Sequence, residues 1–214
     1  MADLFDLVSG GELAELREAL RLDPKLAESR NAAGSSLLAW AAYHRNGEAT
    51  AIVRLARLEI DPYEACILGD AQRVAAAAED GWDCNAPAPD GFTALGLAAF
   101  FGHEPVLDLL LPLTGDVNQP AANAQQVAAL HAATAARQHG LAAKLLRAGA
   151  NPNLAQAGGV VPLHVAAQHG DAAFCGLLTL FGADPHLVDA QGQNAPAHAR
   201  TGGHDWLAER LQRL

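Results

Sequence analysis

The chain has 214 residues, of which 50% are hydrophobic, 5% are aromatic and 18% are charged. Abundant alanine, the strongest helix former, favours a helical protein, and the length allows one large domain or two small ones. The formal net charge of −10 falls mainly on residues 61–126, which carry ten acidic residues and one basic residue. No cluster of lysine and arginine is present to attract a phosphate backbone, so we expect no nucleic-acid partner and favour a neutral or basic protein partner.

Cysteine usage and the N-terminal segment indicate the cellular setting. Cys66, Cys84 and Cys175 form no Cys-x-x-Cys pair, so we expect neither a disulfide framework nor a structural zinc site. Residues 1–6 are acidic and lack the basic start of a secretory signal peptide. No apolar run approaches the length of about 18 residues that a membrane span needs. We therefore expect a cytoplasmic protein with no membrane partner.

Two helices are predicted at the N-terminus. Leucine and valine over residues 4–8 have the spacing of one helix face, and the glycine pair at 10–11 ends that helix. Three leucines within residues 13–20 then form the apolar face of an amphipathic helix, whose charged residues suit a solvated outer surface. We interpret residues 1–33 as an N-terminal capping unit.

From residue 34 onward the sequence repeats. Leu163, in the segment Pro-Leu-His-Val-Ala-Ala, lies 33 residues after Leu130, in the segment Ala-Leu-His-Ala-Ala-Thr. The segment Gly-Ala-Asn-Pro at 149–152 returns as Gly-Ala-Asp-Pro at 182–185 with the same spacing. A period of this length predicts a solenoid, in which each helix pair buries its apolar face against its neighbours.

These landmarks resemble the ankyrin repeat, a β-turn followed by two antiparallel helices. Its Thr-Pro-Leu-His signature is matched only in part, at Thr93, Pro162, His131 and His164. Its Gly-Ala-Asp/Asn ending is matched more completely. The resemblance covers roughly residues 34–214. It implies a stand-alone, bacterial-like all-α solenoid of stacked helix-turn-helix units with short hairpin loops, which binds a protein and needs no cofactor.

Two irregularities interrupt the period. Pro62 follows the matching leucine of the previous unit by 24 residues, nine short of a full repeat, so we expect one hairpin to be missing. Asp61 and Glu64 flank a capping-box pattern around Pro62. This pattern predicts that a helix ending near Glu59 is followed at once by a new helix, with a kink in the stack. The second irregularity is the polar loop at 119–126, which adds two residues.

We predict a single domain over residues 1–214. After the capping unit come units at 34–60, 61–90, 91–126, 127–159 and 160–192, with the lost hairpin between the first two. Residues 193–214 form a C-terminal capping unit. We expect a monomer, because polar caps at both ends keep a solenoid soluble.

Ankyrin proteins usually bind partners on the concave surface built from hairpin tips and exposed ends of first helices. We matched the 33-residue register of this chain to the family's repeat and transferred the family's variable positions. They predict a protein-binding surface at Tyr43, His44, Asp90, Phe92, Phe100, Phe101, Gln125, Gln168 and His169. Ser35, Val127, Ala135, Val160, Gln191 and Gln193 occupy variable positions of the same kind. Half of the chain's six phenylalanines fall in one unit, where we expect a partner's apolar anchor. The alternative is that Phe100 or Phe101 packs against a neighbouring first helix.

Nine histidines raise a different hypothesis, a metal site or an active site. His131 and His164 occupy equivalent repeat positions, and the resemblance implies that the histidine at this position is structural. No acidic residue or cysteine completes a tetrahedral metal set at recognisable spacing, and no P-loop, Gly-x-Ser-x-Gly or His-Glu-x-x-His motif occurs. We therefore predict a non-catalytic interaction module without metal. A metal- or small-molecule-dependent enzyme using the histidine-rich units, or a structural subunit of a larger complex, are the alternatives.

Overall fold

The structure, a computed structural model, describes residues 3–214 and is all-helical, as the sequence predicts. Within these residues the only β-pairing is an isolated bridge between Arg30 and Ser36. Met1 and Ala2, at the start of the acidic N-terminal segment, lie outside the described residues. Over the described part of the chain, no helix is both long enough and apolar enough to cross a membrane.

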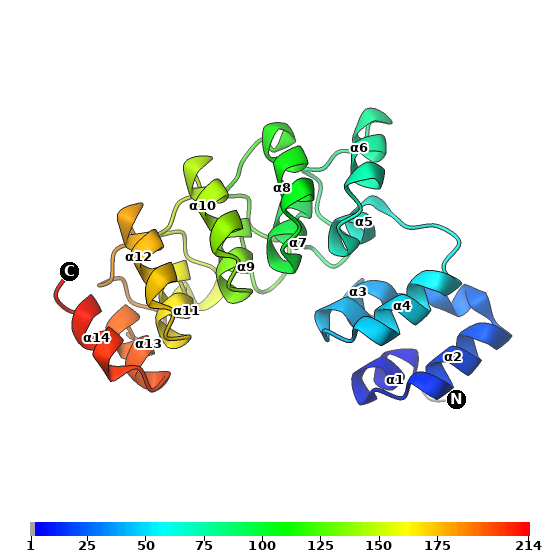
Figure 1. The fold of residues 1–214 in the computed structure, drawn as a ribbon, viewed down its shortest axis with the longest axis horizontal. Helices are drawn as coiled ribbons and strands as arrows, with labels where there is room; N and C mark the ends of the chain where they lie inside the picture. Colours follow the sequence, from blue (N-terminus) through cyan, green and yellow to red (C-terminus); the bar gives the residue numbers. More distant parts are fainter. Residues whose placement is uncertain (1–2) are drawn as a thin grey trace.

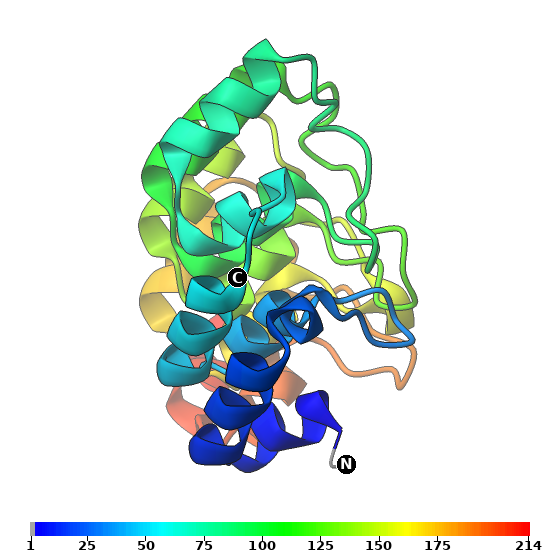
Figure 2. The same cartoon turned by 90° about the vertical axis from the view of Figure 1, so that its right-hand side faces the viewer.

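The α-helices form seven successive pairs (Figure 1). The pairs are α1 (Leu4–Gly10) and α2 (Leu13–Leu22), α3 (Leu37–Tyr43) and α4 (Gly47–Ala56), α5 (Pro62–Leu68) and α6 (Ala71–Glu79), α7 (Ala94–Phe101) and α8 (Glu104–Leu110), α9 (Ala129–Ala135) and α10 (His139–Arg147), α11 (Pro162–Gln168) and α12 (Ala172–Leu180), and α13 (Ala195–Thr201) and α14 (Asp205–Leu211). Short 3₁₀ turns η1 (Pro24–Glu28), η2 (Leu111–Leu113) and η3 (Ala157–Gly159) lie between them. Figure 2 shows the connecting loops projecting to one side of the helices.

One asparagine per unit links the turn that follows a helix pair to the next unit. Its side-chain oxygen accepts a backbone N–H and its side-chain nitrogen donates to a backbone carbonyl, over 2.7–3.3 Å. The bonded sets are Asn85 with Gly115 and Leu113, Asn118 with Asn151 and Gly149, and Asn153 with Asp184 and Gly182. These bonds pair backbone groups that helix packing leaves free, and so fix the register of successive units.

One or two residues after each first helix, a residue adopts a left-handed conformation so that the chain can turn back. Gly170 holds this position after α11, where a Cβ atom would lie 2.5 Å from the ring of His204. Arg45 and Arg137 hold it after α3 and α9, with φ values of 53° and 59°. An L-residue is strained in this region of backbone space, so these two arginines cost stability that glycine would not.

The stack changes direction between the second and third helix pairs (Figure 1). Helix α4 ends at Ala56, and residues 57–61 lead directly to α5. The predicted helix start is confirmed: Asp61 accepts from the Glu64 N–H, and the Glu64 side chain accepts from the Asp61 N–H. The predicted helix end near Glu59 is three residues too late, because Arg57 already has extended backbone geometry.

Charged side chains hold the two sides of this change in direction together. The Arg57 guanidinium is buried and pairs with Glu28 at 2.8 Å and with Glu64 at 3.0 Å. Arg30 pairs with Asp61 at 2.9 Å. Burial raises the pKa of Glu64 from its ordinary value. We call these five residues the joint.

Removing Arg57 should destabilise the joint strongly, because the Glu64 carboxylate would be left buried without its cation. We expect Arg57→Ala to lower the free energy of unfolding by about 3 kcal/mol, measured by urea denaturation. Arg54, three residues earlier on α4 and without an ion-pair partner in residues 3–214, is the matched control. Arg54→Ala should cost about 0.5 kcal/mol or less. Equal effects of the two substitutions would show that the joint contributes nothing specific.

Relieving backbone strain after α3 should stabilise the protein. The Arg45 side chain makes no hydrogen bond or ion pair within residues 3–214, so Arg45→Gly should raise the free energy of unfolding by about 0.5–1 kcal/mol. Arg137→Gly relieves the same strain but loses the 2.7 Å bond from Arg137 to the His169 carbonyl. We expect it to give no net stabilisation in the same denaturation experiment.

Candidate functional site

A partly open apolar cavity of about 260 Å³ lies between the first helices and the hairpin loops. Its walls come from helices α3, α7, α9 and α11 and from the loops that precede three of them. The lining residues are Tyr43, Phe92, Gly96, Leu97, Phe100, Gln125, Val127, His131, Ala132, Ala135, Gln156 and Val165. We call it the concave cavity.

The missing hairpin brings Tyr43 into this cavity. The turn at 31–36 packs directly on the turn at 88–92, so closely that a Cβ atom on Gly34 would overlap the carbonyl of Pro89. The Tyr43 ring therefore lies 5.8 Å from the ring of Phe92. Its hydroxyl donates to the Asp90 carboxylate over 3.0 Å.

The cavity is electrically neutral. No aspartate, glutamate, lysine or arginine lines it. Burial, together with the Asp90 carboxylate, raises the pKa of Tyr43 well above its usual range. Burial lowers the pKa of His131 to about 4, against a smaller opposing effect of the backbone of Val160 and Leu154. Both titratable groups in the wall are therefore uncharged at neutral pH.

The two equivalent histidines differ in their hydrogen bonds. His164 Nδ1 accepts from the Val161 N–H at 3.3 Å, which leaves the proton on Nε2 to be donated to the Leu187 carbonyl at 2.8 Å. This is the structural role that the resemblance implies. His131 is 2% exposed, and the backbone of Leu154 and Val160 lies beside its ring, but within residues 3–214 no contact of its ring nitrogens has full hydrogen-bond geometry.

Six of the predicted surface residues reach the concave cavity, including two of the three phenylalanines predicted in one unit. They are Tyr43, Phe92, Phe100, Gln125, Val127 and, at the exposed end of α9, Ala135. Phe92, Phe100 and Phe101 are all half-buried against the core, and Phe92 and Phe100 also form part of the cavity wall. Their role in binding a partner stays a prediction.

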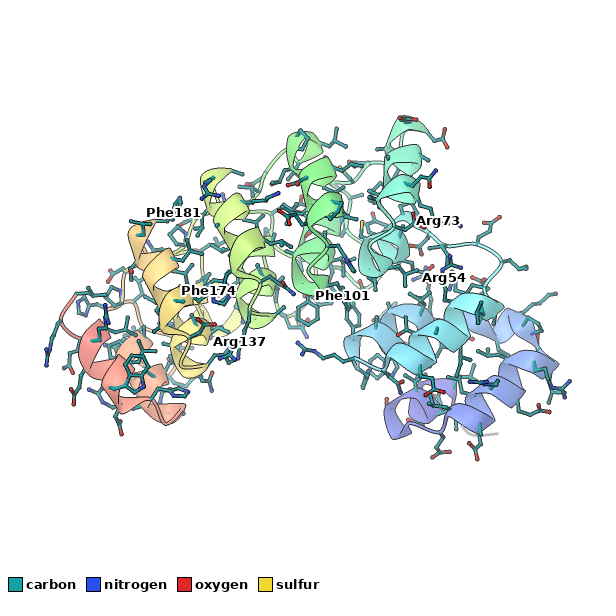
Figure 3. All side chains as sticks on the ribbon, in the orientation of Figure 1. Arg54, Arg73, Phe101, Arg137, Phe174 and Phe181 are labelled. Atoms are coloured by element: carbon teal, nitrogen blue, oxygen red, sulfur yellow. The ribbon has the colours of Figure 1, made fainter. Side chains whose placement is uncertain are left out.

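Other predicted residues lie outside the cavity. Phe101 stacks on Tyr43 at 5.8 Å and lies at the end of α7 that faces α3 and α4 (Figure 3). His44 bonds the Trp40 carbonyl at 2.8 Å. Asp90 is engaged by Tyr43 and Ser35. The remaining positions are not part of the cavity lining: Val160, Gln168, His169, Gln191 and Gln193.

Gln156 is a cavity residue that the sequence reasoning missed. It lies 33 residues after Asn123 and 33 before Asp189, whose side chains accept N–H groups of their own turns. A glutamine at this position makes no such bond here, and its side chain lines the cavity instead. The sequence signal for this residue is a glutamine at a repeat position that otherwise holds asparagine or aspartate.

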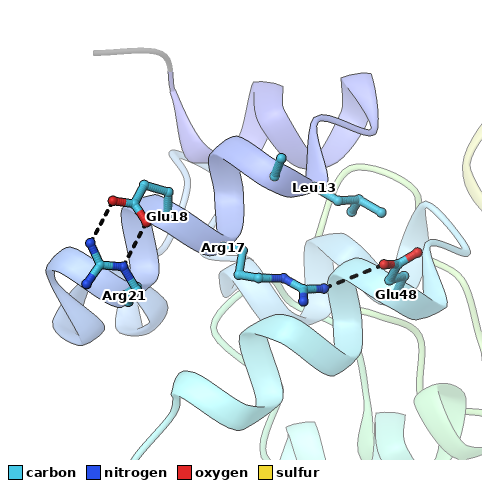
Figure 4. Close-up of a pocket in the computed structure, with 6 residues that line it drawn as sticks. Leu13, Arg17, Glu18, Arg21 and Glu48 are labelled. Atoms are coloured by element: carbon cyan, nitrogen blue, oxygen red, sulfur yellow. Dashed lines mark hydrogen bonds and ion pairs between the residues drawn. The ribbon is translucent and has the colours of Figure 1, made fainter.

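A second hollow lies on the opposite side of the N-terminal units, between α2 and α4 (Figure 4). Arg21 pairs with Glu18 at 2.8 Å and Arg17 with Glu48 at 3.6 Å. The hollow is wide open, and its charges compensate one another in solvent, where such pairs contribute little. It offers a weaker case for specific binding than the concave cavity.

Within residues 3–214, no three histidine, cysteine, aspartate or glutamate side chains come together as a metal site. His198 pairs with Asp189 at 2.9 Å, and His139 pairs with Asp171 at 3.0 Å. All three cysteines are buried and free.

Comparison with known families agrees with the architecture. Residues 38–156 match a model described as ankyrin repeats (3 copies), and residues 158–190 match one described as ankyrin repeat. The first match alone covers more than half of the chain. The protein belongs to the ankyrin-repeat family. Ankyrin repeats serve in general as protein-interaction modules and are generally non-catalytic.

Similar sequences occur within larger proteins. A stretch of 53 residues is 47% identical to part of the ARF GTPase-activating protein GIT2 of mouse and of human, and to part of human GIT1. The stretch is 25% of this ankyrin-repeat chain but only 7–8% of those proteins. The similarity therefore concerns one or two repeats, and the activity in those names belongs to the relatives.

The buried His131 should make stability sensitive to acid. Its pKa of about 4 in the folded protein lies below the 6.5 expected after unfolding, so the unfolded chain takes up the proton first as the pH falls. We expect His131 to account for a loss of up to about 3 kcal/mol between pH 6.5 and pH 4. His131→Leu should flatten the dependence of stability on pH in that window, measured by chemical denaturation at several pH values.

His164 provides the control for this measurement. His164→Leu should already cost about 1–2 kcal/mol at pH 7.5, because the Leu187 carbonyl loses its donor. His131→Leu removes no hydrogen bond within the described chain and should cost less at that pH. An unchanged pH profile in His131→Leu would show that His131 is not protonated on unfolding in this window.

Proposed function

We propose that this ankyrin-repeat chain is a non-catalytic interaction module whose protein partner docks over the concave cavity. The observation that carries the proposal is a partly open, neutral, apolar cavity built jointly by four helix pairs. Clustered aromatic side chains in a pocket of this kind commonly dominate the binding energy of protein interfaces.

The expected partner is neutral, not basic. Most of the acidic surplus of residues 61–126 is engaged within the protein: Asp61 and Glu64 in the joint, Glu104 and Asp108 with Lys144, Asp70 with Arg73, and Asp90 with Tyr43. None of these residues lines the concave cavity. Net charge therefore gives little guidance to the chemistry of this face.

An enzymatic role finds less support in the same geometry. General acid–base chemistry needs a titratable group placed against the reacting atoms with a pKa near the working pH. His131 has its pKa lowered to about 4, and no carboxylate lines the cavity with it. A structural subunit of a larger assembly would use the same docking surface and is one form of the proposed function.

Shortening a cavity-lining ring should weaken partner binding. We expect Phe100→Ala to reduce retention of the partner in affinity capture by at least about 30-fold, the scale of an interface hot spot. Leu55, which is 85% exposed on α4 and remote from the cavity lining, provides the control. Leu55→Ala should retain the partner fully, and thermal unfolding should show that both variants are folded. Equal retention by both variants would place the docking surface elsewhere.

A further inference from the structure

The size of the concave cavity restricts what can enter it. Pockets for small-molecule ligands usually have volumes of roughly 300–1,000 Å³. At about 260 Å³ the cavity lies below that range and has room for one large amino-acid side chain. A nucleotide or an extended cofactor would not be enclosed.

The walls favour an aromatic occupant. Tyr43, Phe92 and Phe100 supply rings on one side, and Val127 and Val165 supply aliphatic groups from the neighbouring units. Aromatic rings gain from offset or edge-to-face contacts with such neighbours beyond the burial of apolar area. A charged side chain would enter without a counter-charge, which is costly.

His131 sets no polar requirement for the occupant. Both of its ring nitrogens are buried, and the backbone of Leu154 and Val160 lies beside the ring, so a group inside the cavity does not reach them. The imidazole is one part of the wall. Phenylalanine, tyrosine and tryptophan therefore all suit this wall.

Two glutamines at the cavity indicate that the aromatic group belongs to a peptide. Gln125 and Gln156 lie on adjacent hairpins, which are joined by the bond from the Ala157 N–H to the Gln125 carbonyl at 3.1 Å. Neither side-chain amide has a hydrogen-bond partner within residues 3–214, and each can both donate and accept. Backbone N–H and C=O groups of an extended segment match this pair.

We propose that the concave cavity binds one aromatic side chain of an extended, uncharged segment of a partner protein, with Gln125 and Gln156 holding the backbone of that segment. This inference rests on the proposed function and specifies the chemistry of the partner.

A phage-displayed library of random 12-residue peptides, selected on the full chain, tests the proposal. The enriched peptides should share one aromatic residue between uncharged residues. Ala135 is exposed and lines the cavity, so Ala135→Trp should obstruct it without disturbing the core. We expect synthetic peptides to lose at least about 30-fold in affinity for Ala135→Trp, and as much when their aromatic residue becomes alanine. Ala148→Trp, on the exposed residue after α10, should bind normally.

The outcomes separate this inference from the proposed function. Peptides that lose affinity for Phe100→Ala but lack an aromatic residue, or tolerate Ala135→Trp, would overturn the inference and leave the proposed function standing. Peptides that bind both variants normally, or the absence of any enriched peptide, would count against both.

Discussion

The absence of one hairpin is the constraint on which the shape of the concave face depends. Because the chain passes from α4 to α5 over residues 57–61, nothing separates the turn at 31–36 from the turn at 88–92. Tyr43 can therefore reach Asp90 and Phe92, in the turn that precedes α7, two helix pairs along the chain from its own. A regular hairpin would stand between these groups, and the wall that Tyr43 contributes to the cavity would be absent.

The short connection from α4 to α5 replaces apolar stacking with polar contacts at one place in the solenoid. Elsewhere, buried leucine, valine and alanine side chains link neighbouring pairs into one core. At the joint, Arg57 lies between Glu28 and Glu64. Apolar contacts are non-directional, whereas an ion pair holds its partners in a fixed geometry. The joint thus specifies the direction in which α5 leaves α4, although burying charge limits what it adds to stability.

Neutrality distinguishes the concave cavity from the rest of this acidic protein. The Asp90 carboxylate accepts hydrogen bonds from Tyr43 and Ser35, and the Asp61 carboxylate pairs with an arginine side chain. Burial keeps His131 uncharged. A neutral, small and partly open cavity selects by shape and by a few hydrogen bonds. Recognition of a single side chain on an extended segment is the form of binding that such a site can support most directly.

The sequence by itself determined the helical repeat, the capping box at Asp61 and the positions of Tyr43, Phe92 and Phe100 near one surface. Each of these follows from local spacing, which the 33-residue period carries from unit to unit. Only the tertiary structure decided that Phe100 lines the cavity while Phe101 turns toward α3, and that the His164 ring makes well-formed hydrogen bonds while the equivalent contacts of His131 lack full hydrogen-bond geometry. These differences depend on how neighbouring units are tilted and spaced, and contacts between residues distant in sequence set that geometry.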